Sequence, residues 1–352
     1  MSDRLRALIP ASLLILALLA GVWLTRPAEP AQHSLRLYGL GTLIDVQIAG
    51  HLNDADYVRI ERDLVARLEA FQTRWSVLRD GDLGQLNATL AEARSAPVAA
   101  PLVPLLQRAQ DICQRSDGRF DPAIGRWIAL WGFENDEAMR TTPPRPEEIS
   151  ALRSPSWCAA RFASSEAGVN VTLPQAGARL NFGGMAKGEA VEELLEVLHA
   201  AGQRNVLVNA GGDLKVLGQS VDRPWRIGIR DPRAEGTPQA LAALALRSGE
   251  ALFSSGDYER YFEHAGVRYH HLLDPATGMP GRRAIAATVL HDDAALADAA
   301  STALFIAGPD AAPAVAAALQ VDQWMVIDTA GVQHTSPALR ARLEDLNEAA
   351  PG

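Results

Sequence analysis

The chain reads LNFGGMAKGEAVEELLEVL from Leu180 to Leu198, with two glycines and one lysine just before a strongly amphipathic segment. Apolar residues in this segment recur at spacings of three and four, which predicts a helix whose buried face consists of Val191, Leu194, Leu195 and Leu198. Glutamates occupy the other side, and Gly202 supplies a stop. The pattern therefore predicts a packed helix that starts at a glycine-rich turn.

The start of this helix has the features of an anion site. Glycines at 183 and 184 let a ligand approach the backbone closely, and a helix start offers unpaired N–H groups. Lys187 adds a positive charge at the same end. A phosphate is the simplest anion that fits. The alternative is that Gly183 and Gly184 only form a tight turn and Lys187 is a solvated charge.

The composition is that of an ordinary globular protein, and it argues against nucleic-acid binding. The chain has 352 residues, of which 48% are hydrophobic and 21% charged, so a substantial core can form. Its formal net charge is −9, and no basic cluster appears in the sequence. Broad binding of nucleic acid would need a basic face.

Residues 1–26 differ from the rest of the chain and predict a membrane anchor or signal segment. Arg4 and Arg6 precede an almost uninterrupted apolar run from Leu8 to Leu24. A run of this length is near the lower limit for spanning a bilayer, and the arginines favour a cytoplasmic N-terminus with the remainder exported. Since no clear cleavage site follows the run, we expect an uncleaved anchor.

Beyond this segment, the sequence predicts a linker at 27–33, one domain at 34–346 and a tail at 347–352. Neither repeats nor strict βαβ alternation is present, so we expect a mixed α+β fold with mostly antiparallel sheets and packed helices. The expected helices span about 54–75, 102–115, 294–306 and 311–319, and a polar turn is expected at 79–88. The expected strands are a pair around the turn at 39–41, then 205–210, 213–218, 225–231 and 323–328.

The two cysteines, Cys113 and Cys158, do not define a disulfide scaffold in a chain this long. An exported location would permit a disulfide between them. We assign them no catalytic role.

Four segments carry residues that packing alone does not explain, namely LVNAGGDLKVLG (207–218), SSGDYERYF (254–262), YHHLLDPATGMP (269–280) and ALADAASTALFIAG (295–308). In the last segment, Asp298 and Thr302 are four residues apart and therefore share one face of a helix. A carboxylate and a hydroxyl in this arrangement can supply two oxygen ligands to a hard cation such as magnesium. The alternative is that Asp298 is the helix N-cap and Thr302 a tolerated polar residue.

With these segments in view, the sequence resembles the ApbE family, the FAD:protein FMN transferases. The resemblance runs from about Gly39 to Gly308. Its pieces occur in order: YGLGTL, DGRFDPAIG with WGF after it, LNFGGMAKG, LVNAGGD, WRIGIRDP, SSGDYER, HHLLDPATGMP and ADAASTALF. Eight pieces in order make a chance similarity improbable.

The resemblance implies a magnesium-dependent enzyme that cuts the diphosphate of FAD and passes FMN to a threonine hydroxyl of a target protein, releasing AMP. It implies that Lys187 contacts the FAD. It also implies a Mg²⁺ site formed by the backbone carbonyl of Gly184, the carboxylate of Asp298 and the hydroxyl of Thr302. The target would be an exported or membrane redox protein, which places the catalytic domain on the periplasmic side of a bacterial inner membrane.

The same resemblance assigns the remaining site residues. His271 is the candidate base for the incoming hydroxyl, with His270 as a rival, or His271 only bonds the turn backbone. The flavin half of FAD would contact Leu40, Arg119, Phe120, Asp121, Asn181 and Leu272. Trp75 would offer an aromatic face to the flavin ring, or would simply end its helix as a core residue.

Two positions depart from the family pattern. Leu40 stands where methionine is common, a mild apolar change. Asn181 stands where aspartate is common, which removes a negative charge near the cofactor or the metal. Two other functions therefore stay open, a magnesium-dependent FAD diphosphatase that yields FMN and AMP, and a flavin-binding carrier without turnover.

Overall fold

The computed structural model describes residues 32–77, 81–134, 139–166, 168–234 and 239–344. The expected membrane segment at 1–26, most of the linker at 27–33 and the tail at 347–352 lie outside the described residues.

The centre of the fold is an eight-stranded sheet in which each neighbouring pair is antiparallel. In spatial order its strands are β1 Gln32–Gly39, β2 Thr42–Ala49, β6 Val206–Ala210, β7 Asp213–Leu217, β10 Ala251–Gly256, β13 Ala284–His291, β14 Gln323–Asp328 and β15 Gln333–Thr335. The arrangement confirms the predicted α+β fold with antiparallel pairing.

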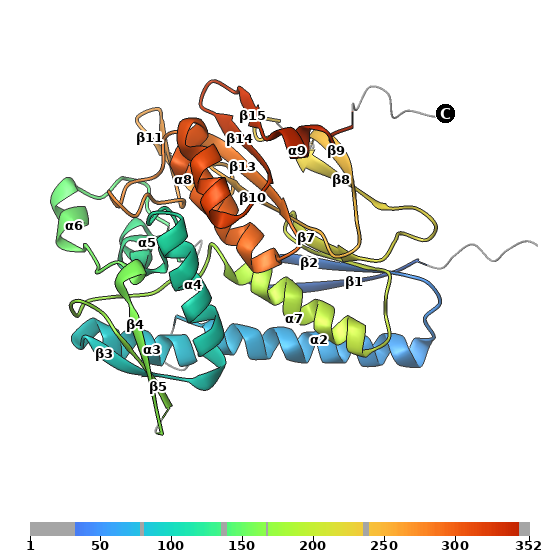
Figure 1. The fold of residues 1–352 in the computed structure, drawn as a ribbon, viewed down its shortest axis with the longest axis horizontal. Coiled ribbons are helices and arrows are strands. Elements are labelled where there is room, and N and C mark those ends of the chain that lie inside the picture. The colour runs from blue at the N-terminus through green and yellow to red at the C-terminus, as the bar shows by residue number, and fades with distance from the viewer. Residues whose placement is uncertain (1–31, 78–80, 135–138, 167, 235–238, 345–352) are drawn as a thin grey trace, which may run out of the picture.

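Helices cover one face of this sheet (Figure 1). Helices α7 (Ala186–Ala200) and α8 (Ala294–Leu319) pack against each other and against the strands, α2 (Asp54–Trp75) runs alongside α7, and α4 (Val103–Arg115) packs on α8. The main hydrophobic core lies between these helices and the sheet. It takes alternate residues from most strands of the sheet, for example Ala287 and Val289 of β13.

The other face of the sheet carries a second core. Here β8 (Trp225–Arg230) and β9 (Ala240–Leu246) form a two-stranded sheet, and the short helix α9 (Pro337–Arg340) packs nearby. Ala286 and Leu290 of β13 point into this core, opposite to their neighbours along the strand.

Smaller elements surround the helical face. A three-stranded sheet and a two-stranded sheet lie apart from the main one, with short helices around them. The elements are α3 Asp82–Glu92, β3 Ser95–Val98, η1 Ala100–Leu102, η2 Pro122–Ile124, α5 Gly125–Trp131, α6 Pro146–Ala151, η4 Trp157–Ala159, β4 Arg161–Ser165, β5 Gly168–Thr172, β11 Tyr261–His264 and β12 Val267–His270. A third, aromatic cluster near α5 contains Trp131, Phe133 and Phe262.

One sequence prediction was wrong: most of the polar turn expected at 79–88 is helix α3. Leu83, Leu86 and Leu90 repeat at helical spacing and are buried, and this packing outweighs the turn tendency of Gly84 and Asn87. The two alanine-rich helices expected near the C-terminus are joined in α8, which has a kink at the left-handed residue Gly308.

Among the described residues, α8 is long and apolar enough to cross a membrane. It packs against α7, β10 and β13, and most of its residues are buried. The helix therefore serves as the core helix of this domain.

Candidate functional site

Two asparagines build the turn that leads into α7. The side chain of Asn87 accepts a hydrogen bond from the backbone N–H of Leu180 at 2.7 Å and donates to its carbonyl at 2.9 Å. The Oδ1 atom of Asn181 accepts from the N–H of Gly183 at 2.8 Å, and the N–H of Asn181 donates to the carbonyl of Pro122. These bonds fix the backbone immediately before Gly184.

Gly188 brings the start of α7 against α8. A Cβ atom at this position would lie 2.3 Å from the carbonyl oxygen of Ala294, so a larger residue does not fit. The close contact lets the Asp298 carboxylate accept a hydrogen bond from the N–H of Gly188 at 3.0 Å. Asp298 is not the N-cap of α8, because Asp293 has that role and accepts from Leu296 N–H.

The three predicted metal ligands, Gly184, Asp298 and Thr302 (the ligand trio), lie at this contact. A Cβ atom on Gly184 would lie 3.0 Å from the Oγ1 atom of Thr302, so the glycine backbone lies close to that hydroxyl. Asp298 lies one helical turn before Thr302 and is only 3% exposed. A carbonyl, a carboxylate and a hydroxyl are oxygen ligands of the kind that a hard divalent cation takes.

Two serines complete the polar environment of Thr302. The Ser255 hydroxyl lies 3.2 Å from the Thr302 hydroxyl and 2.8 Å from that of Ser301. Ser301 donates to the carbonyl of Asp298 at 2.8 Å. Sequence reasoning singled out the segment containing Ser255 but gave this residue no role.

Lys187 forms an ion pair with Asp213. Sequence reasoning gave Asp213 no role. Asp213 is 3% exposed and accepts a further hydrogen bond from Ser254 N–H at 2.7 Å. Its GGD turn was the available signal, but the pairing depends on how β7 lies beside α7. Asp213 therefore holds Lys187 at the start of α7.

Buried charges shift the pKa values at this site. Burial lowers the pKa of Lys187, but the carboxylates of Asp213 and Asp298 raise it by more, so the lysine stays charged. The pKa of Asp298 is raised to about 7, because burial and the negative charge of Asp213 together outweigh the lowering effect of Lys187. Perturbed groups of opposite sign in one cluster are typical of functional sites.

The two histidines have different surroundings. The Nδ1 atom of His271 lies 3.3 Å from the carbonyl oxygen of Arg260, and burial lowers the pKa of His271 to about 3. His270 is 4% exposed, its Nε2 atom lies 2.8 Å from the carbonyl oxygen of Gly281, and burial lowers its pKa to about 4. Both rings are therefore neutral near pH 7, and a carbonyl fixes the protonated nitrogen of each.

One predicted flavin contact, Phe120, lies near Gly184, and another, Leu40, sits in a strained turn. The ring of Phe120 comes within 3.6 Å of the position that a Cβ on Gly184 would take. Leu40 has a left-handed φ of 56° and donates its N–H to Gln72 Oε1 at 3.0 Å. At the next residue, Gly41, a Cβ atom would lie 2.6 Å from a guanidinium nitrogen of Arg260.

Other predicted flavin contacts have protein partners. The Arg119 guanidinium donates to the carbonyl of Ser116 at 3.1 Å, and Leu272 is 6% exposed. Trp75 is 8% exposed and packs against Phe71 and Phe182, with the centre of the Phe182 ring 5.2 Å away. This packing favours the interpretation of Trp75 as a core residue.

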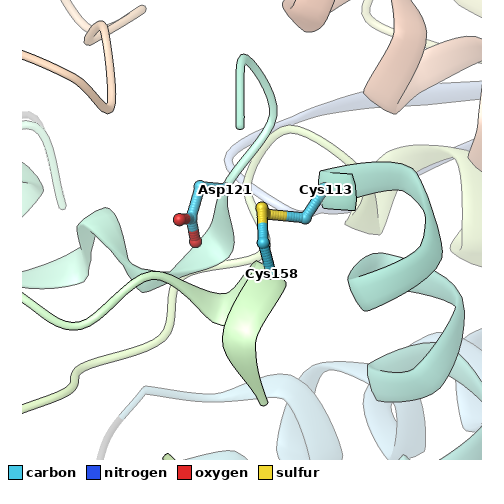
Figure 2. Close-up of side chains that lie close together, drawn as sticks. All are labelled: Cys113, Asp121 and Cys158. Carbon is cyan, nitrogen blue, oxygen red and sulfur yellow. A yellow bond between two sulfur atoms is a disulfide. The ribbon is translucent and has the colours of Figure 1, made fainter. Parts of the chain in front are cut away.

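Asp121 lies beside a disulfide between Cys113 and Cys158, as Figure 2 shows. Its carboxylate accepts from the N–H groups of Ala123 at 2.9 Å and Trp157 at 3.2 Å. The ligand atoms of Asp121 and the two cysteines lie within 4.8 Å of one another, but the bonded sulfurs offer no thiolate to a metal. Asp121 therefore bonds the backbone here.

A cavity of about 630 Å³ lies elsewhere, with Arg247, Arg342 and Glu344 among its lining residues. Its wall also includes Leu246 of the second core, on the opposite face of the sheet from the helices. None of Gly184, Lys187, Asp298 and Thr302 lines this cavity, so it is separate from the cluster of donors and charges at the start of α7.

Solved ApbE structures have the same fold. An ApbE protein from Thermotoga maritima superposes with a TM-score of 0.78 at 29% identity, covering 90% of this chain and 100% of its own. The flavin transferase ApbE from Vibrio cholerae gives 0.77 at 25% identity, covering 89% and 100%.

The ApbE family model matches residues 40–325, and the chain belongs to the ApbE family. A curated relative from Rhodobacter capsulatus, named FAD:protein FMN transferase, is 38% identical over 91% of this chain and 60% of its own length. A relative of the same name from Treponema pallidum is 32% identical over 76% of this chain and 77% of its own. The chain thus spans 60% of the length of the first relative and about three quarters of the second.

Proposed function

We propose that this chain is a Mg²⁺-dependent FAD:protein FMN transferase that attaches FMN to a threonine hydroxyl of an acceptor protein and releases AMP. The observation that carries the proposal is the grouping of Gly184, Asp298 and Thr302 at the start of α7, beside Lys187. Family membership and the names of the relatives support it. The acceptor would be an exported or membrane redox protein.

The oxygen set of Gly184, Asp298 and Thr302 fits a hard cation and would hold Mg²⁺. When bound there, Mg²⁺ neutralises negative charge on the diphosphate of FAD. Lys187 is charged and lies beside this oxygen set, so it would bind and orient the diphosphate. The N–H groups of Ala186 and Gly188 in the first turn of α7 already donate to the Phe182 carbonyl and to Asp298. Phosphoryl transfer needs little more than such positioning and charge neutralisation.

A base must take the proton of the acceptor threonine. If Nδ1–H of His271 donates to the Arg260 carbonyl, Nε2 carries the lone pair and can accept that proton. The threonine oxygen then forms a bond to the phosphorus of the FMN half. The P–O bond to the AMP half breaks, and its electron pair leaves with AMP.

The test is to incubate the full chain with FAD, Mg²⁺ and an acceptor that carries the threonine. We expect the intact mass of the acceptor to rise by one FMN, with an equal amount of AMP. Thr302→Val, which keeps the shape but removes the hydroxyl, should lower kcat/KM about a hundredfold, roughly 3 kcal/mol in transition-state stabilisation. Thr302→Ser, which keeps the hydroxyl, is the matched control and should retain most of the activity.

Two outcomes would contradict transfer. Release of free FMN and AMP at the same rate with and without acceptor would indicate the diphosphatase. Tight binding of FAD without any cleavage, for several threonine acceptors, would indicate the carrier.

A further inference from the structure

The disulfide joins two segments that border the candidate site but has no part in the proposed reaction. It links the end of α4 to the turn η4, across a sequence separation of 45 residues. Cys113 is fully buried, whereas Cys158 is half-buried and faces the surface in part. A reducing thiol could therefore reach the bond from the Cys158 side.

Residues 116–121 follow α4 and fold back onto Cys113. The N–H of Gly118 donates to the carbonyl of Cys113 at 2.8 Å, and the Ser116 hydroxyl donates to the same carbonyl at 3.1 Å. The Ser116 oxygen in turn accepts from the N–H of Phe120 at 3.1 Å. The backbone position of Phe120 is thus set by the end of α4 that carries the disulfide.

The η4 side holds the same segment from its other end. Asp121 accepts from the N–H of Trp157, the residue before Cys158, at 3.2 Å. The side chain of Gln114 donates to the carbonyl of Cys158 at 2.8 Å. Figure 2 shows Asp121 and both cysteines side by side, so the covalent bond and these hydrogen bonds close one compact unit.

This unit determines what lies against the ligand trio. The Phe120 ring comes within 3.6 Å of the position of a Cβ on Gly184, and that position is 3.0 Å from the Thr302 hydroxyl. A displacement of residues 116–121 would therefore move an aromatic wall of the site. A binding site whose groups are already held in place has a higher affinity, because binding then costs less conformational entropy.

We propose that the Cys113–Cys158 disulfide is a redox-sensitive positioning bond for the FAD site. A dithiol reduces it by thiol–disulfide exchange: the S–S bond breaks, the cysteines gain two electrons and two protons, and the dithiol is oxidised to its own disulfide. The end of α4, onto which residues 116–121 fold, then loses its covalent tie to η4, and Phe120 no longer holds its place against Gly184. The inference rests on the proposed function and adds to it a requirement for an oxidising compartment.

The test measures the Kd for FAD by flavin-fluorescence titration of the full chain, oxidised, reduced with dithiothreitol, and reoxidised with glutathione disulfide. We expect reduction to raise the Kd about tenfold, and reoxidation to restore it. The double variant Cys113→Ser with Cys158→Ser should bind FAD as weakly as the reduced chain, and dithiothreitol should not change its Kd. Without thiols, this variant also excludes metal capture beside Asp121.

Leu244→Ala is the matched control, because it removes a buried side chain from the second core and leaves residues 116–121 untouched. It should lower stability while the Kd for FAD stays unchanged. An unchanged Kd on reduction would overturn the proposal, and so would an equal loss of affinity in Leu244→Ala. Since the titration needs no turnover, a redox-dependent Kd without FMN transfer would refute only the proposed function.

Discussion

Asn181 illustrates, at the scale of single residues, how a site can keep its backbone geometry while its charge changes. Its Oδ1 atom accepts from Gly183 N–H at 2.8 Å, a bond that an aspartate oxygen would also accept. The departure from the family pattern therefore preserves the turn before Gly184. What it removes is one negative charge at the turn that leads into α7. The pKa values of Lys187 and Asp298 depend on each other.

His271 is the residue whose replacement tests the base. His271→Ala should lower kcat by about 10²- to 10⁴-fold, because the acceptor hydroxyl loses its proton acceptor. FAD binding should change little. Steady-state kinetics with varied acceptor measures this effect, and His270→Gln is the control that leaves His271 in place. If kcat is unaffected in His271→Ala, the histidine serves only to bond the Arg260 carbonyl.

His270 predicts a pH dependence of stability. The unfolded histidine takes up a proton near pH 6.5, but the folded one only near pH 4, so acid favours unfolding between these values. The contribution is present above about pH 6.5, is lost as the pH falls through about 4, and amounts to about 3 kcal/mol. His270→Gln can still donate to the Gly281 carbonyl but does not titrate.

Urea unfolding of His270→Gln and the unaltered chain at several pH values measures that difference. The free energy of unfolding should fall more steeply with acid in the unaltered chain. Parallel curves for the two proteins from neutral pH to about pH 4 would contradict a buried, neutral His270.

At the scale of elements, the contact between α7 and α8 assembles the ligand trio. In Gly188→Ala the new Cβ would lie 2.3 Å from the Ala294 carbonyl, so the two helices must separate. We expect a loss of about 1–3 kcal/mol in the free energy of unfolding. Urea denaturation measures it, and transfer activity should fall as well because Asp298 loses its bond to Gly188 N–H.

Glu196→Ala is the matched control on the same helix. Glu196 is exposed, and its partner among the described residues is Arg67, in a surface ion pair, so its removal should change stability by less than about 0.5 kcal/mol. Equal stability of Gly188→Ala and the unaltered chain would show that α7 and α8 can separate without cost.

At the scale of the whole molecule, the apolar segment at 1–26 predicts attachment to a membrane. The full chain should fractionate with membranes, and a chain that starts at residue 32 should be recovered in the soluble fraction with unchanged kcat. The described domain has its own packed cores, so its activity should not depend on the segment. Recovery of the full chain in the soluble fraction would contradict the anchor.

The sequence predicted the elements whose pattern is local. Helix α2 begins and ends at the predicted residues, and β6, β7, β8 and β14 lie within one residue of the predicted strands, because periodicity and turns mark them. Helix α3 was missed, since Gly84 and Asn87 resemble turn residues when their burial is unknown. Strand β13 was missed because both of its faces are buried, so its sequence does not alternate.

For the candidate site too, the sequence predicted the residues that are related by a local pattern and missed those that only packing brings together. Asp298 and Thr302 could be predicted as a pair, because they lie one turn apart on one helix. The Lys187–Asp213 pair and the hydroxyl of Ser255 beside Thr302 depend on how α7, β7, β10 and α8 pack, which no local pattern encodes. Trp75 is an aromatic residue at a helix end, and only the structure places it between Phe71 and Phe182.

The most direct test of the central claim is a crystal of the chain soaked with FAD and Mn²⁺, with the cation located by anomalous scattering. The account predicts one strong peak within coordination distance of the Gly184 carbonyl, Asp298 and Thr302, with the diphosphate beside Lys187. A diphosphate bound away from the start of α7, or a cation far from positions 298 and 302, would contradict it.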